Sequence, residues 1–173
     1  MADRVLLLGM MGAGKTTVGR ALAARLGWPY LDNDDLVAEA AGASKEALLA
    51  RSGEPALRAA EAAALRLALT RPGPLVAGIA GGVVLDRDCV RLLLRADLVV
   101  WLRARHATVA ARLDADRQDR PWLQGDTLAA VTRLGAGREP VYAEVADLVV
   151  DVDDQAPDAV ADRIAALVRA PLA

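Results

Sequence analysis

The segment from Gly9 to Thr16 has the residue types that bind a nucleotide phosphate. It fits the pattern G-x-x-x-x-G-K-[ST] at every fixed position. A loop of this kind aims backbone N–H groups at one point, and the positive end of the following helix dipole strengthens the field there. The pattern therefore predicts that Lys15 reaches the β- and γ-phosphates and that the Thr16 hydroxyl ligates Mg²⁺.

Carboxylates follow the next short apolar segment. Asp32 could support Mg²⁺ directly or through a water molecule, and Asp34 could accept the proton of a substrate hydroxyl. The alternative is that the acidic run from Asp32 to Asp35 only caps the following helix, where carboxylates suit the helix dipole. One residue can serve both purposes, so the sequence leaves the two interpretations open.

Three arginines are candidate functional residues, and each also has a simpler interpretation. Arg58 lies within side-chain reach of Glu54 and Glu61 on one helix, and a surface ion pair is the simpler interpretation. Arg120 lies in a charged segment that ends at a proline, so it could close over the phosphates or remain solvated. Arg138 has the position of an ordinary arginine at the start of a helix.

The composition favours one domain without a membrane span. The 173 residues are 54% hydrophobic, yet no uninterrupted apolar run is long enough for a membrane helix. The net charge of −2 and the few aromatic residues argue against a nucleic-acid partner. Cys89 is expected to be a buried small residue, and His106 a solvated residue at a helix start. The first residues lack a secretory signal, so we expect one cytoplasmic domain over residues 1–173.

Strand-like and helix-like segments alternate along the chain, which predicts an α/β fold with a parallel sheet. The predicted strands are residues 4–8, 28–31, 75–77, 98–102 and 148–152. The predicted helices are residues 17–26, 36–41, 45–52, 55–70, 86–95, 107–113, 127–134, 138–146 and 157–168, with a mobile surface segment at 114–122. Gly135 and Gly137 are expected to interrupt a helix, and Leu94 is expected to face the core. Because ligands gather beyond the carboxyl ends of parallel strands, the loops at 9–16, 32–35 and 78–82 should open on one edge.

Five segments, taken in order, resemble the shikimate kinase family over nearly the whole length of the chain. Many nucleotide-binding families share the phosphate loop, so the ordered set carries the resemblance. Residues 31–34 look like the family's Asp-x-Asp, and residues 53–61 are similar to its Gly-Glu-x-x-Phe-Arg-x-x-Glu. Residues 80–85 lie where the family has its triple glycine. Residues 120–123 resemble its Arg-Pro-Leu-Leu lid, and residues 138–142 its Arg-x-Pro-x-Tyr.

The resemblance implies an ATP-dependent kinase that phosphorylates the 3-hydroxyl of shikimate. It also implies that the kinase binds Mg²⁺ and is a monomer. The resemblance further implies a three-layer P-loop kinase fold: a five-strand parallel sheet with the phosphate-loop strand central, helices on both faces, and a lid over about residues 114–125. The residues implied for ATP are Gly12, Ala13, Gly14, Lys15, Thr16, Thr17, Arg112, Arg120 and Pro157. Those implied for shikimate are Asp34, Arg58, Gly81, Gly82 and Arg138, and those for Mg²⁺ are Thr16 and Asp32. The implied catalytic residues are Lys15, Asp34 as the base, and Arg120 on the lid.

The chain departs from the family pattern on the substrate and lid side. The family's Thr-Gly-Gly-Gly is Ile-Ala-Gly-Gly at 79–82, its usual Phe is Leu57, and Trp122 replaces a lid leucine. If the first glycine needs a left-handed conformation, Ala80 costs about 1–2 kcal/mol there. Two alternatives therefore stay open: a related kinase for another hydroxylated carboxylate or a cyclitol, and a nucleotide-binding module without turnover.

Overall fold

A computed structural model of the chain describes residues 2–116 and 125–170, and these residues form a five-stranded sheet whose neighbours are all parallel. The strands are β1 (Arg4–Leu8), β2 (Tyr30–Leu31), β3 (Leu75–Gly78), β4 (Val99–Arg103) and β5 (Leu148–Asp151). Their order is β2-β3-β1-β4-β5, so the strand that enters the phosphate loop lies in the centre. The predicted α/β fold with this central strand is confirmed.

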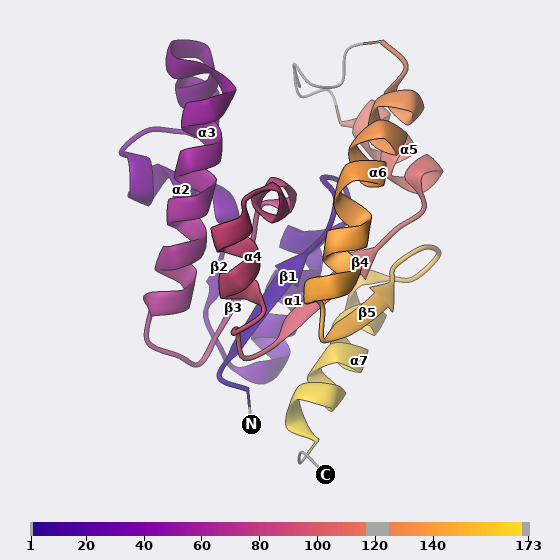
Figure 1. Cartoon of the computed structure of the whole chain (residues 1–173). Helices are drawn as coiled ribbons and strands as arrows, with labels where there is room; N and C mark the ends of the chain where they lie inside the picture. Colours follow the sequence, from indigo (N-terminus) through magenta and orange to yellow (C-terminus); the bar gives the residue numbers. More distant parts are fainter. Residues whose placement is uncertain (1, 117–124, 171–173) are drawn as a thin grey trace.

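Helices cover both faces of the sheet (Figure 1). They are α1 (Lys15–Leu26), α2 (Asn33–Ala41), α3 (Lys45–Thr70), the short 3₁₀ helix η1 (Gly81–Leu85), α4 (Arg87–Leu93), α5 (His106–Ala115), α6 (Thr127–Val145) and α7 (Pro157–Arg169). Helices α1 and α7 pack together on one face, and α4 and α6 lie on the other. None of the helices in the described part of the chain is both long and apolar enough to cross a membrane.

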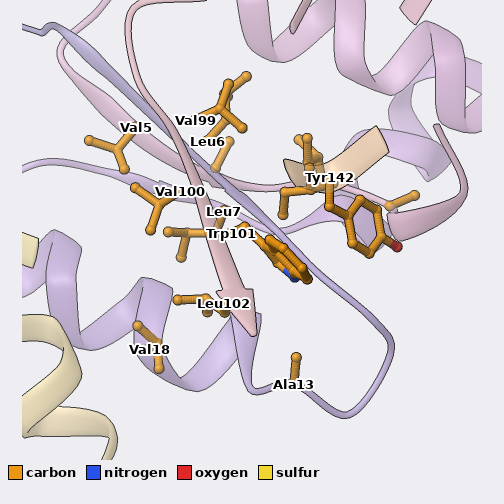
Figure 2. Close-up of a cluster of buried hydrophobic side chains, with 14 of the residues drawn as sticks. Val5, Leu6, Leu7, Ala13, Val18, Val99, Val100, Trp101, Leu102 and Tyr142 are labelled. Carbon is orange, nitrogen blue, oxygen red and sulfur yellow. The ribbon is translucent and has the colours of Figure 1, made fainter. Parts of the chain in front are cut away.

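The core is centred on β1 and β4 (Figure 2). The four residues Val5 to Leu8 of β1 have no exposed surface, which is why this strand reads as an unbroken apolar run. Trp101 of β4 packs against Tyr142 of α6, with ring centroids 5.6 Å apart and the rings tilted by 58°. This contact attaches α6 to the sheet close to the phosphate loop, because Ala13 of that loop belongs to the same buried cluster.

Helix α3 contains the two helices that the sequence predicts at 45–52 and 55–70. Gly53 lies between them with φ 75° and ψ −177°, which is not helical, and the chain continues in helical form after it. The Ser44 side chain accepts a hydrogen bond from the backbone N–H of Ala47 (3.2 Å) and so caps the first part. Helix α3 packs along α2 and also contacts η1.

The predicted interruption of α6 by Gly135 and Gly137 is wrong, because α6 runs without a break from Thr127 to Val145. A Cβ on Gly135 would lie 2.5 Å from Nε2 of His106, so this glycine allows α5 and α6 to approach closely. The expectation of a solvated His106 is also wrong. Its Nε2 lies 2.8 Å from Glu139 Oε1, and the pair joins the same two helices.

Three further segments differ in part from the sequence-based expectations: the end of α4, the glycine run at 78–82 and the end of α5. Leu94 is 54% exposed and does not face the core, whereas Cys89 on the same helix is buried as expected. The glycine run at 78–82 is not a simple loop, since η1 begins at Gly81. Helix α5 extends through Ala115, and residues 117–124, which include Arg120 and most of the predicted lid, lie outside the described residues.

Candidate active site

The phosphate loop opens α1 in the way an anion site requires. Gly14 is the N-cap of α1 with φ 95° and ψ 19°, a left-handed conformation that a glycine adopts without strain. This N-cap has no side chain to accept a hydrogen bond from the first helical N–H groups. Those N–H groups and the positive end of the helix dipole are therefore available to a phosphate.

The surroundings of Lys15 disfavour its positive charge unless an anion binds beside it. Its Nζ donates hydrogen bonds to the backbone carbonyl oxygens of Gly9 (2.8 Å) and Met10 (2.9 Å). Burial, followed by the positive charges of Lys45 and Arg138, lowers the pKa of Lys15 to about 8, although Asp34 and Asp32 act in the opposite direction. A bound phosphate would favour the protonated lysine, so this position suits a polyanion.

Asp32 performs both of the functions that the sequence left open. Its Oδ1 accepts a hydrogen bond from the Asp34 backbone N–H (3.0 Å) and caps α2, while its Oδ2 accepts one from the Thr16 hydroxyl (2.9 Å). The Tyr30 hydroxyl also donates to Oδ2 at 3.4 Å, and the pKa of Tyr30 is raised by burial and by the Asp32 charge. A hydroxyl beside a carboxylate offers the oxygen ligands that Mg²⁺ prefers. Within the described residues no cluster of three or more His, Cys, Asp or Glu could hold a metal by itself, so the remaining ligands would be phosphate oxygens and water.

One cavity of about 510 Å³ extends from the phosphate loop toward the start of α7, and we call it the α7 cavity. Its lining joins loop residues 12–17 to Arg112, Gln155 and Pro157. Arg112 also donates a hydrogen bond from Nη1 to the Gly12 carbonyl oxygen (3.1 Å). The structure thus brings the phosphate loop together with residues that lie nearly 150 positions away in the sequence.

A second cavity, of about 270 Å³, lies on the other side of the loop beside α2, and we call it the α2 cavity. Its lining includes the residues predicted for the substrate, which are Asp34, Arg58, Gly81, Gly82 and Arg138. Gly12, Lys15 and Thr16 line both cavities. The three loops after the first three strands therefore do open on one edge, and the two cavities meet at Lys15.

The two arginines of the α2 cavity differ in their surroundings. Arg58 forms ion pairs with Glu61 (2.7 Å) and Glu54 (2.8 Å), so the ion pairing expected from the sequence is confirmed. A Cβ on Gly82 would lie 2.3 Å from Arg58 Nη1, so this glycine makes room for the guanidinium in the cavity. Arg138 is only 4% exposed, and no carboxylate of the described residues forms an ion pair with it. A buried cation without a carboxylate partner is suited to bind an anion from solution.

Gly81 holds the two sides of the site together. Its carbonyl oxygen accepts a hydrogen bond from the Tyr142 hydroxyl (2.8 Å), and burial raises the pKa of Tyr142 to about 12. A Cβ on Gly81 would lie 2.6 Å from both the Gly9 carbonyl oxygen and the Tyr142 hydroxyl oxygen. Ala80 has φ −64° and ψ 132°, an ordinary extended conformation, so the strain considered for a left-handed residue does not arise.

Lys45 also lines the α2 cavity, although no motif in the sequence indicates it. Its Nζ lies 2.6 Å from Asp34 Oδ1. One signal in the sequence could have found it: the chain has two lysines, Lys15 and Lys45, among 21 basic residues. The predicted catalytic Arg120 lies outside the described residues, so its position relative to the two cavities stays a prediction.

Comparison with known proteins agrees with this geometry. The sequence model of the family described as shikimate kinase matches residues 11–169. A shikimate kinase from Moorella thermoacetica is 41% identical over 165 residues, which cover 95% of this chain and 93% of that protein. A shikimate kinase from Stenotrophomonas maltophilia is 42% identical over 168 residues, which cover 96% of this chain and 91% of that protein.

Solved structures show the same relationship in three dimensions. The shikimate kinase from Acinetobacter baumannii in complex with shikimate superposes with a TM-score of 0.88 at 31% identity, covering 97% of this chain and 93% of that chain. The shikimate kinase from Bacteroides thetaiotaomicron superposes with a TM-score of 0.85 at 26% identity, covering 97% of this chain and 99% of that chain. The chain therefore has the P-loop kinase fold and belongs to the shikimate kinase family, a family of phosphotransferases that use an alcohol group as acceptor.

Proposed function

We propose that this protein transfers the γ-phosphoryl group of ATP to the 3-hydroxyl of shikimate, producing ADP and shikimate 3-phosphate. The observation that carries the proposal is Arg138, a buried arginine without a described carboxylate partner, in a cavity that meets the phosphate loop. An anionic acceptor held at Arg138 lies next to the place where a γ-phosphate would sit. The bound shikimate of the Acinetobacter baumannii relative supports the choice of acceptor.

The α7 cavity is the proposed site for the nucleotide. The backbone of residues 12–17 and the Lys15 ammonium bind the phosphates, while Arg112 and Pro157 contact the base. Thr16 and Asp32, whose side chains are already 2.9 Å apart, would hold Mg²⁺. Bound there, the metal would neutralise charge on the phosphate oxygens.

The α2 cavity is the proposed site for the acceptor. Arg58 and Arg138 hold the shikimate carboxylate, because guanidinium groups match the geometry of a carboxylate. The oxygen of the 3-hydroxyl bonds to the γ-phosphorus of ATP, and Asp34 accepts the proton that this hydroxyl loses. The bond between the γ-phosphorus and the β–γ bridging oxygen breaks at the same time, which releases ADP. From its place in the sequence, Arg120 is assigned to the charge that develops on the transferred group.

A second acceptor class is favoured by one observation. Ile79 and Ala80, which replace the family's Thr and first Gly, line the α2 cavity, whereas Leu57, which replaces its Phe, is buried outside that lining. A changed wall can admit a different hydroxylated carboxylate or a cyclitol. Arg58 and Arg138 favour the carboxylate of these two.

The decisive experiment measures ADP release by a coupled assay with Mg²⁺, ATP and shikimate, and identifies the product by phosphorus NMR. Quinate and myo-inositol replace shikimate in parallel reactions, and Lys15→Met is the matched inactive control. We expect turnover with shikimate that the control lacks. Turnover with another acceptor alone would support the second class, and nucleotide binding without any turnover would support a binding module.

The proposal treats residues 1–173 as one domain that acts as a cytoplasmic monomer. The residues proposed for ATP and for shikimate all come from one chain, which supports the monomer. ATP as the donor favours the cytoplasm, where this nucleotide is abundant. Light scattering after size exclusion tests the monomer, and a particle of twice the chain mass would contradict it.

A further inference from the structure

Lys45 occupies a position that local helix chemistry does not favour. It is the first residue of α3, where the positive end of the helix dipole disfavours a cation. The Ser44 side chain already caps this helix, so α3 does not need Lys45 for its start. A residue that opposes the local preference in this way is expected to serve a tertiary contact or a function.

The tertiary contact of Lys45 is Asp34, the proposed base. The Nζ–Oδ1 distance is 2.6 Å, and the side chains are 30% and 60% exposed, so solvent screens the pair and its value for stability is small. Asp34 is the second residue of α2, and α2 packs closely along α3. The pair therefore joins two helix starts at the wall of the α2 cavity.

Among the described residues, the polar partners of the Asp34 carboxylate approach one of its two oxygens. Lys45 Nζ and, at 3.3 Å, Asn33 Nδ2 both approach Oδ1. Among the residues that the structure describes, Oδ2 has no hydrogen-bond partner. The ammonium also lies close to the phosphate loop, because Lys45 and Lys15 line the same cavity.

We infer that Lys45 is a positioning residue for phosphoryl transfer: it holds Asp34 by Oδ1 and leaves Oδ2 to accept the hydroxyl proton of the acceptor. The inference rests on the proposed function, since it assumes that Asp34 meets an acceptor hydroxyl. A freely rotating carboxylate would find the productive orientation only part of the time, and small misplacements of a reacting group cost large factors in rate.

The test compares three variants with the wild type in the ADP-release assay. Lys45→Met removes the charge and keeps the apolar stem, Lys45→Arg keeps a charge, and Arg87→Met is the matched control. Arg87 is likewise the first residue of a helix, α4, but it is exposed and lies outside the lining of the α2 cavity. We expect Lys45→Met to lower kcat by about 30- to 100-fold while the KM for ATP changes by less than about 2-fold. Lys45→Arg should recover most of kcat, and Arg87→Met should match the wild type.

A double-mutant cycle then asks whether Lys45 acts through Asp34. Shikimate binding is measured by calorimetry with a non-hydrolysable ATP analogue for wild type, Lys45→Met, Asp34→Asn and the double variant. We expect Lys45→Met to weaken shikimate binding when Asp34 is present. In the protein that already carries Asp34→Asn, we expect Lys45→Met to have no further effect on shikimate binding. If Lys45→Met destabilises the fold, the Lys45→Arg variant still provides the comparison.

The outcomes separate the two proposals. If the wild type phosphorylates shikimate and Lys45→Met has the same kcat, the positioning inference alone is overturned. The same holds if Lys45→Met still weakens shikimate binding in the protein that carries Asp34→Asn. A wild type without turnover overturns the proposed function, and the inference falls with it.

Discussion

The two sides of the active site are built from different kinds of chemistry. The proposed donor side is built around the phosphate loop, which offers backbone groups of the continuous segment 9–17 and the start of one helix, and Arg112 and the start of α7 join it from distant parts of the sequence. The acceptor side uses side chains from α2, α3 and α6 and the backbone of η1. A backbone site is specified by local conformation, whereas a side-chain site depends on how distant elements pack. Substrate choice can therefore change on the acceptor side while the donor side stays intact.

The two sides meet at a crowded contact. Gly81 of the acceptor side lies against the Gly9 carbonyl of the donor loop and accepts a hydrogen bond from Tyr142. Tyr142 lies one helical turn after Arg138 on α6, and its ring packs on Trp101 of the sheet. The position of the acceptor side relative to the phosphate loop thus depends on close packing at one glycine.

The largest expected effect separates chemistry from donor binding. Asp34→Asn should lower kcat by about 1,000-fold or more, because the amide cannot accept the hydroxyl proton. Nucleotide affinity should stay nearly unchanged, since the donor side does not use this carboxylate. The fold should persist because the cap of α2 comes from Asp32. ADP release and calorimetry with an ATP analogue measure the two quantities, and near-normal turnover would refute the role of Asp34 as base.

The next effect distinguishes the two arginines within the acceptor side. Arg138→Met should lower kcat/KM for shikimate by about 100-fold, through the loss of a charge-assisted hydrogen bond. It should lower the melting temperature less than Arg58→Met does, because Arg138 has no carboxylate partner among the described residues that the substitution would leave unpaired.

Arg58→Met provides the contrast to Arg138→Met. It should also weaken shikimate binding, but it should cost about 1–2 kcal/mol of stability, because Glu61, which is 7% exposed, loses its cation. Steady-state kinetics and thermal unfolding of both variants provide the comparison. Equal melting temperatures for the two would contradict the difference we describe.

A third prediction addresses the contact between the two sides. Gly81→Ala should destabilise the protein by about 2 kcal/mol and impair turnover, because the added Cβ meets two oxygens at 2.6 Å. Ala80→Gly restores the glycine of the family pattern next to it. It should leave turnover nearly unchanged, because Ala80 is unstrained. Urea unfolding and the kinase assay test both variants. A gain of activity in Ala80→Gly would show that the first glycine of the family's triple glycine matters for catalysis.

The smallest effect concerns Tyr142 at high pH. Its folded-state pKa of about 12 lies above the ordinary value of 10.0, so the folded protein keeps a proton that the unfolded chain releases. This stabilisation is complete below pH 10 and is lost as pH rises through 12, with about 1.4 kcal/mol gone by pH 11. Urea unfolding between pH 7 and 11 measures the slope.

Tyr142→Phe is the control for this slope, because it keeps the ring and removes the titrating hydroxyl. The variant should be less stable at neutral pH, where the bond to the Gly81 carbonyl is lost, and its stability should fall less steeply above pH 10. A residual slope is expected from Tyr30, whose pKa is also raised. Identical slopes for variant and wild type would contradict the role of Tyr142.

The sequence alone determined the phosphate loop of the proposed donor side and the general architecture. The apolar run of β1, the glycines of the loop and the helical spacing after it are local features, and each dictates the conformation of its own few residues. The alternation of strands and helices then restricts the fold to a parallel sheet with its ligands at the carboxyl edge. The ordered motifs also placed Asp34, Arg58 and Arg138 in one predicted site.

Packing between distant elements settles which of these polar residues share a cavity and which are simply paired. Gly135 looked like a helix break until His106 was found against it, and Asp32 turned out to serve as a cap and as the partner of Thr16. Lys45 was missed because an ion pair between two helix starts leaves no periodic pattern in the chain. Local conformation is encoded in neighbouring residues, but burial and charge partners arise only when distant elements pack together.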